Sequence, residues 1–256
     1  MKKIGFLVLC LLTALFFVVG ADAQTTKKKA KKKPKKTVQP APKVEIKPTF
    51  TRSAGTVASY FFPTDSGTAW QMRTIRMQFD DTGKIVSSDT TFNEQRVSSN
   101  KGFSLQRLPL VICETKGYKL GGLDTAVGKA YYYVDDSIAM TVMNNSVSNI
   151  ENRVFLVAPL HDSNAWHEKY EDSVYCAIES MTDSVEVPVG RFDSVLTTVT
   201  RVGYTELRKY YVQGYGLVKI LFRAPGPGGR GLMAIKSEMM ALAPGKKEES
   251  VNTGMK

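Results

Sequence analysis

Few residues of this chain have the side-chain types and the spacing that a catalytic or metal-binding site requires. Its only two histidines are His161 and His167, with Asp162 beside the first. Two imidazoles and a carboxylate could bind a metal ion. However, a strand beginning near Trp166 would place His167 on its exposed face and leave His161 in the preceding turn. We therefore predict no metal site, and we expect no cofactor.

One glycine-rich segment formally matches a dinucleotide-binding motif. Residues 226–231 read Gly-Pro-Gly-Gly-Arg-Gly and follow an apolar run. The motif needs a helix after its last glycine and an acidic residue about 20 positions further on. Only 25 residues follow Gly231, and they end in a polar tail. A loop between two strands is the better interpretation.

Activated nucleophiles and acid/base pairs are equally hard to find. No serine lies in a Gly-x-Ser-x-Gly turn, and no cysteine has an obvious histidine partner. The adjacent carboxylates Asp80/Asp81 and Asp135/Asp136 are typical of solvated turns. Two carboxylates far apart in sequence could still serve a secreted hydrolase. That class stays a third alternative, and we predict no catalytic residue.

The elements that would position any site are strands. From Thr49 to about Pro244, short segments rich in Val, Ile, Tyr, Phe and Thr alternate with Gly, Asp, Asn and Pro. This pattern predicts an all-β fold of antiparallel meanders that form a curled sheet or a sandwich. The last segment also fits a helical stripe, but we favour a strand. We expect a hairpin turn at 80–84 and strands at 55–62, 69–80, 84–97, 109–115, 129–144, 152–158, 165–180, 191–202, 207–213, 215–223 and 231–242.

The two tryptophans have similar settings. Residues 63–70 and 159–166 both begin with Pro and end with Ala-Trp. This similarity suggests a duplicated meander and two related lobes, 49–150 and 151–245. A tryptophan at the start of a strand is usually a core anchor, and ligand stacking is the alternative. Trp70 and Trp166, together with Met233 and Met239 as an adaptable apolar wall, are our candidate contacts for an apolar ligand.

Two cysteines lie within the predicted strands. In an oxidising compartment, Cys113 and Cys176 could form one disulfide that closes a long loop. Two buried, inert thiols are the alternative, since the sequence does not supply their separation.

The net charge of +11 is concentrated in one segment. Residues 49–245 contain 20 basic and 20 acidic side chains, so the body offers no reason to predict a nucleic-acid-binding domain. Residues 24–48 contain ten lysines and only one acidic residue, Glu45. We predict that this segment is a disordered tether for an anionic envelope surface or lipid; a solubilising linker is the alternative. Its dense lysine run consists of Lys27, Lys28, Lys29, Lys31, Lys32, Lys33, Lys35 and Lys36.

The N-terminus predicts export. Lys2 and Lys3 precede an uncharged apolar run that ends in Ala-Asp-Ala, the three parts of a secretory signal at 1–23, with cleavage between Ala23 and Gln24. The expected location is periplasmic or secreted. An uncleaved membrane anchor is the alternative, because the apolar run is long and the lysines after it resist translocation. Residues 246–256 are expected to form a disordered tail.

Part of the chain resembles a known group of proteins. Residues 185–193, Val-Glu-Val-Pro-Val-Gly-Arg-Phe-Asp, and 210–219, Tyr-Tyr-Val-Gln-Gly-Tyr-Gly-Leu-Val-Lys, are similar to the V-P-A-G-x-F … Y-Y-A-x-G-x-G-L-V-K signature of uncharacterised exported bacterial β-proteins and lipoproteins. Residues 159–166 likewise resemble the P-L-x-x-G-x-x-W opening strand of that group. The resemblance covers about residues 156–242 and departs from the family pattern at Asn164 and at Val212-Gln213. It implies a curled antiparallel sheet in an envelope protein with no established activity.

These patterns predict binding more than catalysis. The first expectation is a non-enzymatic envelope protein that binds or carries an apolar ligand or a protein partner. The alternative is a structural or adaptor protein whose lysine run holds it at an anionic surface.

Overall fold

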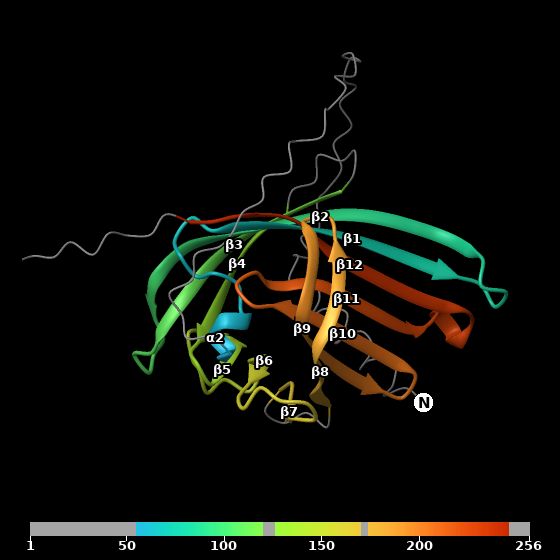
Figure 1. Cartoon of the computed structure of the whole chain (residues 1–256). Helices are drawn as coiled ribbons and strands as arrows, with labels where there is room; N and C mark the ends of the chain where they lie inside the picture. The colour runs from blue at the N-terminus through green and yellow to red at the C-terminus, as the bar shows by residue number, and fades with distance from the viewer. Residues whose placement is uncertain (1–54, 120–125, 170–173, 246–256) are drawn as a thin grey trace, which may run out of the picture. The chain divides into compact units, whose positions relative to one another are not determined.

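The computed structural model describes residues 55–119, 126–169 and 174–245, all of which belong to one unit, Pro48–Lys256. This body is almost entirely antiparallel β, as predicted (Figure 1). Twelve strands form one sheet: β1 (Ala69–Phe79), β2 (Ile85–Phe103), β3 (Pro109–Lys119), β4 (Ala126–Val134), β5 (Ile138–Thr141), β6 (Val154–Val157), β7 (Ala165–His167), β8 (Tyr175–Val187), β9 (Gly190–Val202), β10 (Thr205–Val212), β11 (Gly216–Pro225) and β12 (Leu232–Ala243).

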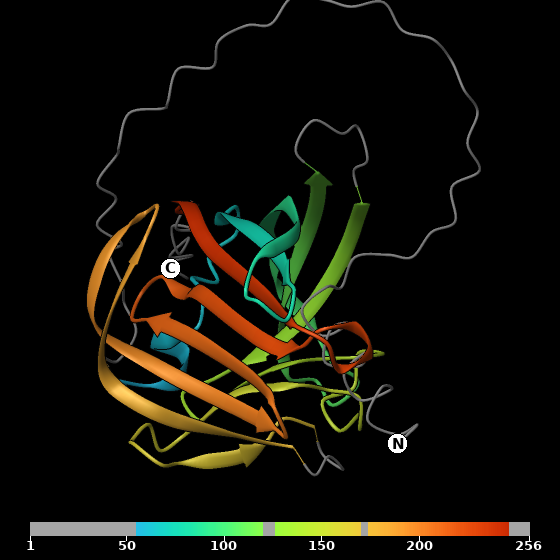
Figure 2. The ribbon, with the colours of Figure 1, turned by 90° about the vertical axis from the view of Figure 1, so that its right-hand side faces the viewer.

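The sheet consists of two meanders that run away from a shared centre. Its strand order is β6-β5-β4-β3-β2-β1-β12-β11-β10-β9-β8-β7, so β1 pairs with β12 in the middle. The sheet curves strongly, as Figures 1 and 2 show. The two edge strands, β6 and β7, come together at their ends: the N–H of Val154, the first residue of β6, donates to the carbonyl of Glu168, just after β7, over 2.8 Å. Residues far apart in sequence therefore share one interior.

The division into two lobes stays a prediction, and its boundary does not coincide with the halves of the sheet, because β6 pairs with β5. Residues 49–150 contain β1 to β5, and residues 151–245 contain β6 to β12. Trp70 and Trp166 are the second residues of β1 and β7, and both are buried.

A short plug occupies the inner side of the sheet. The prediction of a strand at 55–62 is wrong: helix α2 (Val57–Tyr60) leads into Phe61 and Phe62, and Figure 1 shows it beside β5. All six residues from 57 to 62 are buried. Buried and exposed residues would alternate along a strand with one solvent-facing side, whereas every residue of this plug is buried. Gly216, at φ +80°, lets the plug approach closely, because a Cβ there would lie 2.6 Å from the Phe62 nitrogen.

Two predicted strands are each divided in two. The segment 129–144 breaks into β4 and β5 because the carboxylate of Asp135 accepts hydrogen bonds from the N–H groups of Ser137 and Ile138 and closes a turn. The segment 165–180 breaks into β7 and β8, and the alternation that predicted one strand persists on both sides of the break. Trp166, Cys176 and Ile178 are buried, as that alternation predicts.

The predicted turns are confirmed. Asp80 accepts hydrogen bonds from Thr82 and Lys84 and closes the β1–β2 hairpin. Residues 226–231 form a loop with a single 3-10 turn (Pro227–Gly229), and β12 follows it antiparallel to β11, without the helix that a dinucleotide site requires. The last segment is a strand, not a helix.

Candidate functional site

Three of the four predicted ligand contacts belong to the protein's own core. Trp70, Trp166 and Met239 are buried in the main apolar cluster of the inner face. The Trp70 ring lies 4.3 Å from the Phe62 ring of the plug, measured between centroids. The Trp166 indole N–H donates to the carbonyl of Val154 across the sheet edges. Met233 lies apart from them and is half-buried near the start of β12.

The cysteines and histidines do not form a reactive group. Cys113 in β3 and Cys176 in β8 are two buried free thiols, the second of the two predicted alternatives. Burial raises the pKa of both, that of Cys113 to about 12, so both stay protonated and inert. His161 and His167 are exposed. Within the described ranges, no three His, Cys, Asp or Glu side chains gather in a way that could hold a metal ion.

The inner face instead contains a buried ion pair between the residue that follows β7 and the middle of β10. Glu168 follows β7, and Lys209 lies in the middle of β10. The ammonium nitrogen of Lys209 lies 3.1 Å from Glu168 Oε1, and the two side chains are only 9% and 6% exposed. The same ammonium lies 5.6 Å from the centre of the Phe155 ring. The backbone of Glu168 also bonds Val154 and Val174, so the pair fixes the point where the edges meet.

Hydroxyl and thiol groups surround this pair. Sheet register places Thr198 opposite Lys209 and Thr200 opposite Cys176, and Tyr211 is two residues after Lys209 on the same strand. The hydroxyls of Thr198, Thr200 and Tyr211 are buried and make no hydrogen bond of ordinary geometry with the described residues. We call these six residues the buried polar cluster: Glu168, Cys176, Thr198, Thr200, Lys209 and Tyr211.

The pKa shifts in this cluster favour a structural role over a catalytic one. Burial would lower the pKa of Lys209, but the charge of Glu168 outweighs it and holds the pKa above its usual value. Burial raises the pKa of Tyr211. Lysine, tyrosine and cysteine are all protonated at neutral pH as a result. A nucleophile or general base needs the opposite arrangement.

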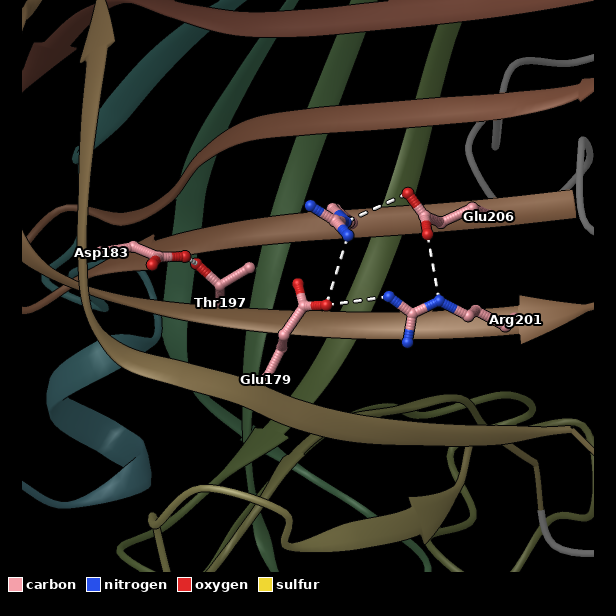
Figure 3. A network of polar contacts seen from close by, with 6 residues as sticks. Glu179, Asp183, Thr197, Arg201 and Glu206 are labelled. Atoms are coloured by element: carbon pink, nitrogen blue, oxygen red, sulfur yellow. Dashed lines mark hydrogen bonds and ion pairs between the residues drawn. The ribbon is translucent and has the colours of Figure 1, made fainter.

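The outer face of the same strands holds exposed ionic networks (Figure 3). The Arg201 guanidinium lies 2.8 Å from Glu179 Oε1 and 3.0 Å from Glu206 Oε2. Arg208 contacts the same two carboxylates at 3.2 and 3.0 Å. Beside this network, Asp183 accepts a hydrogen bond from the Thr197 hydroxyl. Two arginines therefore neutralise two glutamates across β8, β9 and β10.

A second outer group centres on Glu238 in β12. Its carboxylate lies 2.8 Å from the Lys236 ammonium, 3.1 Å from the Arg73 guanidinium and 4.0 Å from the Lys219 ammonium. Sheet register places Tyr210, Lys219, Glu238 and Arg73 in one row across four strands. Much of the charge of the folded body is thus balanced within its own surface.

Two buried carboxylates should make the fold sensitive to acid. Burial would raise the pKa of Glu168, but the charge and hydrogen bond of Lys209 lower it below its usual value. For Glu238, burial is likewise outweighed by Lys236 and Arg73. A carboxylate whose folded pKa lies below its unfolded pKa adds stability that is complete above the unfolded value. That stability is lost as the pH falls through the folded value.

We therefore expect the free energy of unfolding to be nearly constant from about pH 7 to 5 and to fall steadily below about pH 4.5. Urea denaturation followed between those limits and about pH 3 measures this dependence. A double variant, Glu168→Gln/Lys209→Met, should show a shallower loss because one of the two groups no longer titrates. An acid dependence as steep as that of the natural chain would contradict this role for Glu168.

Sequence reasoning missed both members of the ion pair. Glu168 falls on the same face as Trp166 in the predicted alternation, and Lys209 lies between the inward positions Leu207 and Tyr211. A charged residue at an inward position of each strand was the available signal. What the sequence did not show was that these two side chains meet, because β7 and β10 are not neighbours in the sheet.

The predictions for residues 1–48 and 246–256 concern residues outside the described part of the chain. They include the signal, the cleavage site at Ala23 and Gln24, and the lysine run. No helix in the described part of the chain has the length and apolar character to cross a membrane.

Comparison with known proteins yields two loose structural similarities. No family model matches the chain, and no curated protein matches it. A Bacteroides fragilis protein inferred to be exported, with a YmcC-like fold, shares 12% sequence identity at a TM-score of 0.45, over 73% of this chain and 100% of that one. An inferred lipoprotein of Parabacteroides distasonis shares 16% identity at a TM-score of 0.42, over 73% of this chain and 99% of that one. Neither assigns a function to any residue of this chain.

Proposed function

We propose that this chain is an exported, non-enzymatic protein of the cell envelope, held at an anionic surface by the lysine run at 27–36. One observation supports this above all: the distribution of charge between the folded body and the segment before it. The body has equal numbers of basic and acidic side chains, and it pairs many of them. Residues 24–48 contain ten lysines against Glu45 alone.

Export is part of the same proposal. The basic start, the apolar run and the Ala-Asp-Ala sequence of residues 1–23 support secretion with cleavage after Ala23. Once outside the cytoplasm, the lysine run would directly precede the folded body. Each lysine near a charged membrane contributes about 1 kcal/mol, so several acting together suffice for stable association.

The interior supports a carrier role less well. Trp70, Trp166 and Met239 are packed against the protein's own side chains, and the plug at 57–62 lies on the inner side of the sheet. An apolar ligand would have to compete with those contacts. The packing of the interior therefore favours a structural or adaptor role for the folded body over a carrier role.

The test is a variant in which glutamine replaces the eight lysines of the dense run. We expect the chain without residues 1–23 to bind vesicles of phosphatidylglycerol and phosphatidylcholine at low ionic strength. The variant should bind at least about 100-fold more weakly, because each lost charge removes part of the attraction. Neutral phosphatidylcholine vesicles should bind both proteins equally and much more weakly, because the lysines then have no anionic partner. Co-sedimentation measures the bound fraction.

The matched control removes positive charge from the folded body. Lys84 and Arg230 are exposed, and a Lys84→Gln/Arg230→Gln variant should bind nearly as well as the natural chain. If the eightfold variant binds anionic vesicles as tightly as the natural chain, the tether proposal fails.

A further inference from the structure

Two connecting loops expose large apolar side chains at one end of the sheet. Phe103 at the end of β2 is 66% exposed, and Leu105 in the following loop is 75% exposed. Ile150, in the connection between β5 and β6, is 51% exposed. We call these two loops, residues 103–107 and 143–150, the apolar platform. Water contact with three such side chains costs free energy that a partner surface would recover.

The platform is held together by hydrogen bonds. The Leu105 N–H donates to the carbonyl of Asn145 over 2.7 Å. The Gln106 amide donates to the hydroxyls of Ser146 and Ser148 over 3.0 and 3.2 Å, and its oxygen accepts from the Val147 N–H. The apolar side chains are therefore presented by a preformed surface, which lowers the entropy lost on binding.

The charge of the platform selects the kind of surface. Residues 98–112 and 137–150 include no acidic residue, but they include Lys101 and Arg107, both exposed. The opposite end of the sheet differs: there, exposed Ile85, Val86 and Leu232 lie near Asp80, Asp81 and Asp89, whose charges offset those of Lys84 and Arg230. An apolar surface beside exposed Lys101 and Arg107, with its neighbouring carboxylate Glu151 paired to Lys169, suits an interface that is both anionic and apolar.

The first described residues of the chain lie close to the platform. The Val57 N–H donates to the carbonyl of Asp136 in the β4–β5 turn, so the chain enters the body at the start of β5. The platform loop at 143–150 begins just after the end of β5. A strand of four residues spans roughly 13 Å, so Val57 and the start of the platform loop are separated by about that distance along β5.

We propose that the apolar platform inserts Phe103, Leu105 and Ile150 into the headgroup region of an anionic lipid bilayer, with Arg107 at the phosphate level. This inference rests on the proposed function and extends it, since it names lipid as the anionic surface and adds a second contact. The lysine run supplies long-range attraction, which salt screens. The platform supplies apolar burial, which salt does not screen.

The experiment compares Leu105→Glu with Val86→Glu on phosphatidylglycerol/phosphatidylcholine vesicles at low and high salt. Both positions are exposed apolar residues, at 75% and 56%, and both variants change the charge equally. We expect Leu105→Glu to lose on the order of tenfold in the affinity that remains at high salt. Val86→Glu should match the natural chain. Equal high-salt affinity of Leu105→Glu and Val86→Glu would overturn the platform.

A second variant gives a direct depth measurement. With Phe103→Trp, vesicles containing brominated acyl chains should quench the new tryptophan emission, because its ring would lie at the headgroup boundary. Absence of quenching on bound protein would also overturn the inference. The same vesicles test the tether proposal separately. If that proposal is wrong, the variant with eight lysines replaced by glutamine would bind like the natural chain at low salt, whether or not the platform inserts.

Discussion

Replacing Lys209 with methionine is expected to destabilise the folded body by about 3–5 kcal/mol. The substitution would leave the Glu168 carboxylate buried with its main counter-charge gone, and Lys209 provides its 3.1 Å contact. A buried, unpaired charge is among the most costly defects in a protein interior. Chemical denaturation at neutral pH, compared with the natural chain, measures the loss.

Removing both charges should reverse most of the damage. A Glu168→Leu/Lys209→Met variant leaves no buried charge, and such exchanges are often neutral or stabilising. Lys169→Met is the control, because it removes the ion pair between Lys169 and Glu151, in which the Glu151 side chain is 61% exposed. It should lower the free energy of unfolding by at most about 1 kcal/mol. If Lys209→Met costs no more than Lys169→Met, the ion pair does not hold the edges together.

Replacing Trp70 with alanine is expected to cost about 3–5 kcal/mol of stability. The ring is buried against Phe62 of the plug and lies opposite Leu242 of β12. Its loss would leave a cavity between the plug and the centre of the sheet, where the two meanders join. Thermal and urea denaturation measure the effect.

The result separates the two roles considered for this tryptophan. The protein loses much stability when a core tryptophan is truncated, whereas it loses little when the truncated residue stacks on a ligand at an open surface. Tyr204→Ala provides the reference for an exposed aromatic, since that side chain is 92% exposed, and it should stay within about 0.5 kcal/mol of the natural chain. A Trp70→Ala variant as stable as Tyr204→Ala would contradict the core role.

Strand content was predictable because it depends on short-range patterns. The Asp80 turn, the alternation around Cys176 and the loop at 226–231 follow from turn chemistry and from period-2 burial, and all three are present. The plug at 57–62 was not predictable in this way. Its aromatic and apolar residues match a strand, and only the space inside the curved sheet makes a short helix the better solution.

The buried polar cluster was out of reach for a related reason. Each member is visible in the sequence, but Glu168 and Lys209 are 41 residues apart. Glu168 follows β7 and Lys209 lies in β10, and these two strands are not paired. Only curvature of the sheet brings them together. Three of the four candidate ligand residues, Trp70, Trp166 and Met239, lie inside the core, where large apolar side chains pack against one another.

The central claim is that attraction to an anionic surface resides in the lysine run, and its ionic-strength dependence tests that claim most directly. The affinity of the chain for phosphatidylglycerol/phosphatidylcholine vesicles would be measured from low salt to well above physiological salt. Screening shortens the reach of charge to about 8 Å at physiological ionic strength and to about 3 Å at 1 M. We predict a steep fall that converges on the affinity of the eightfold glutamine variant. An affinity that is independent of salt, or equal in the two proteins throughout, would contradict the claim.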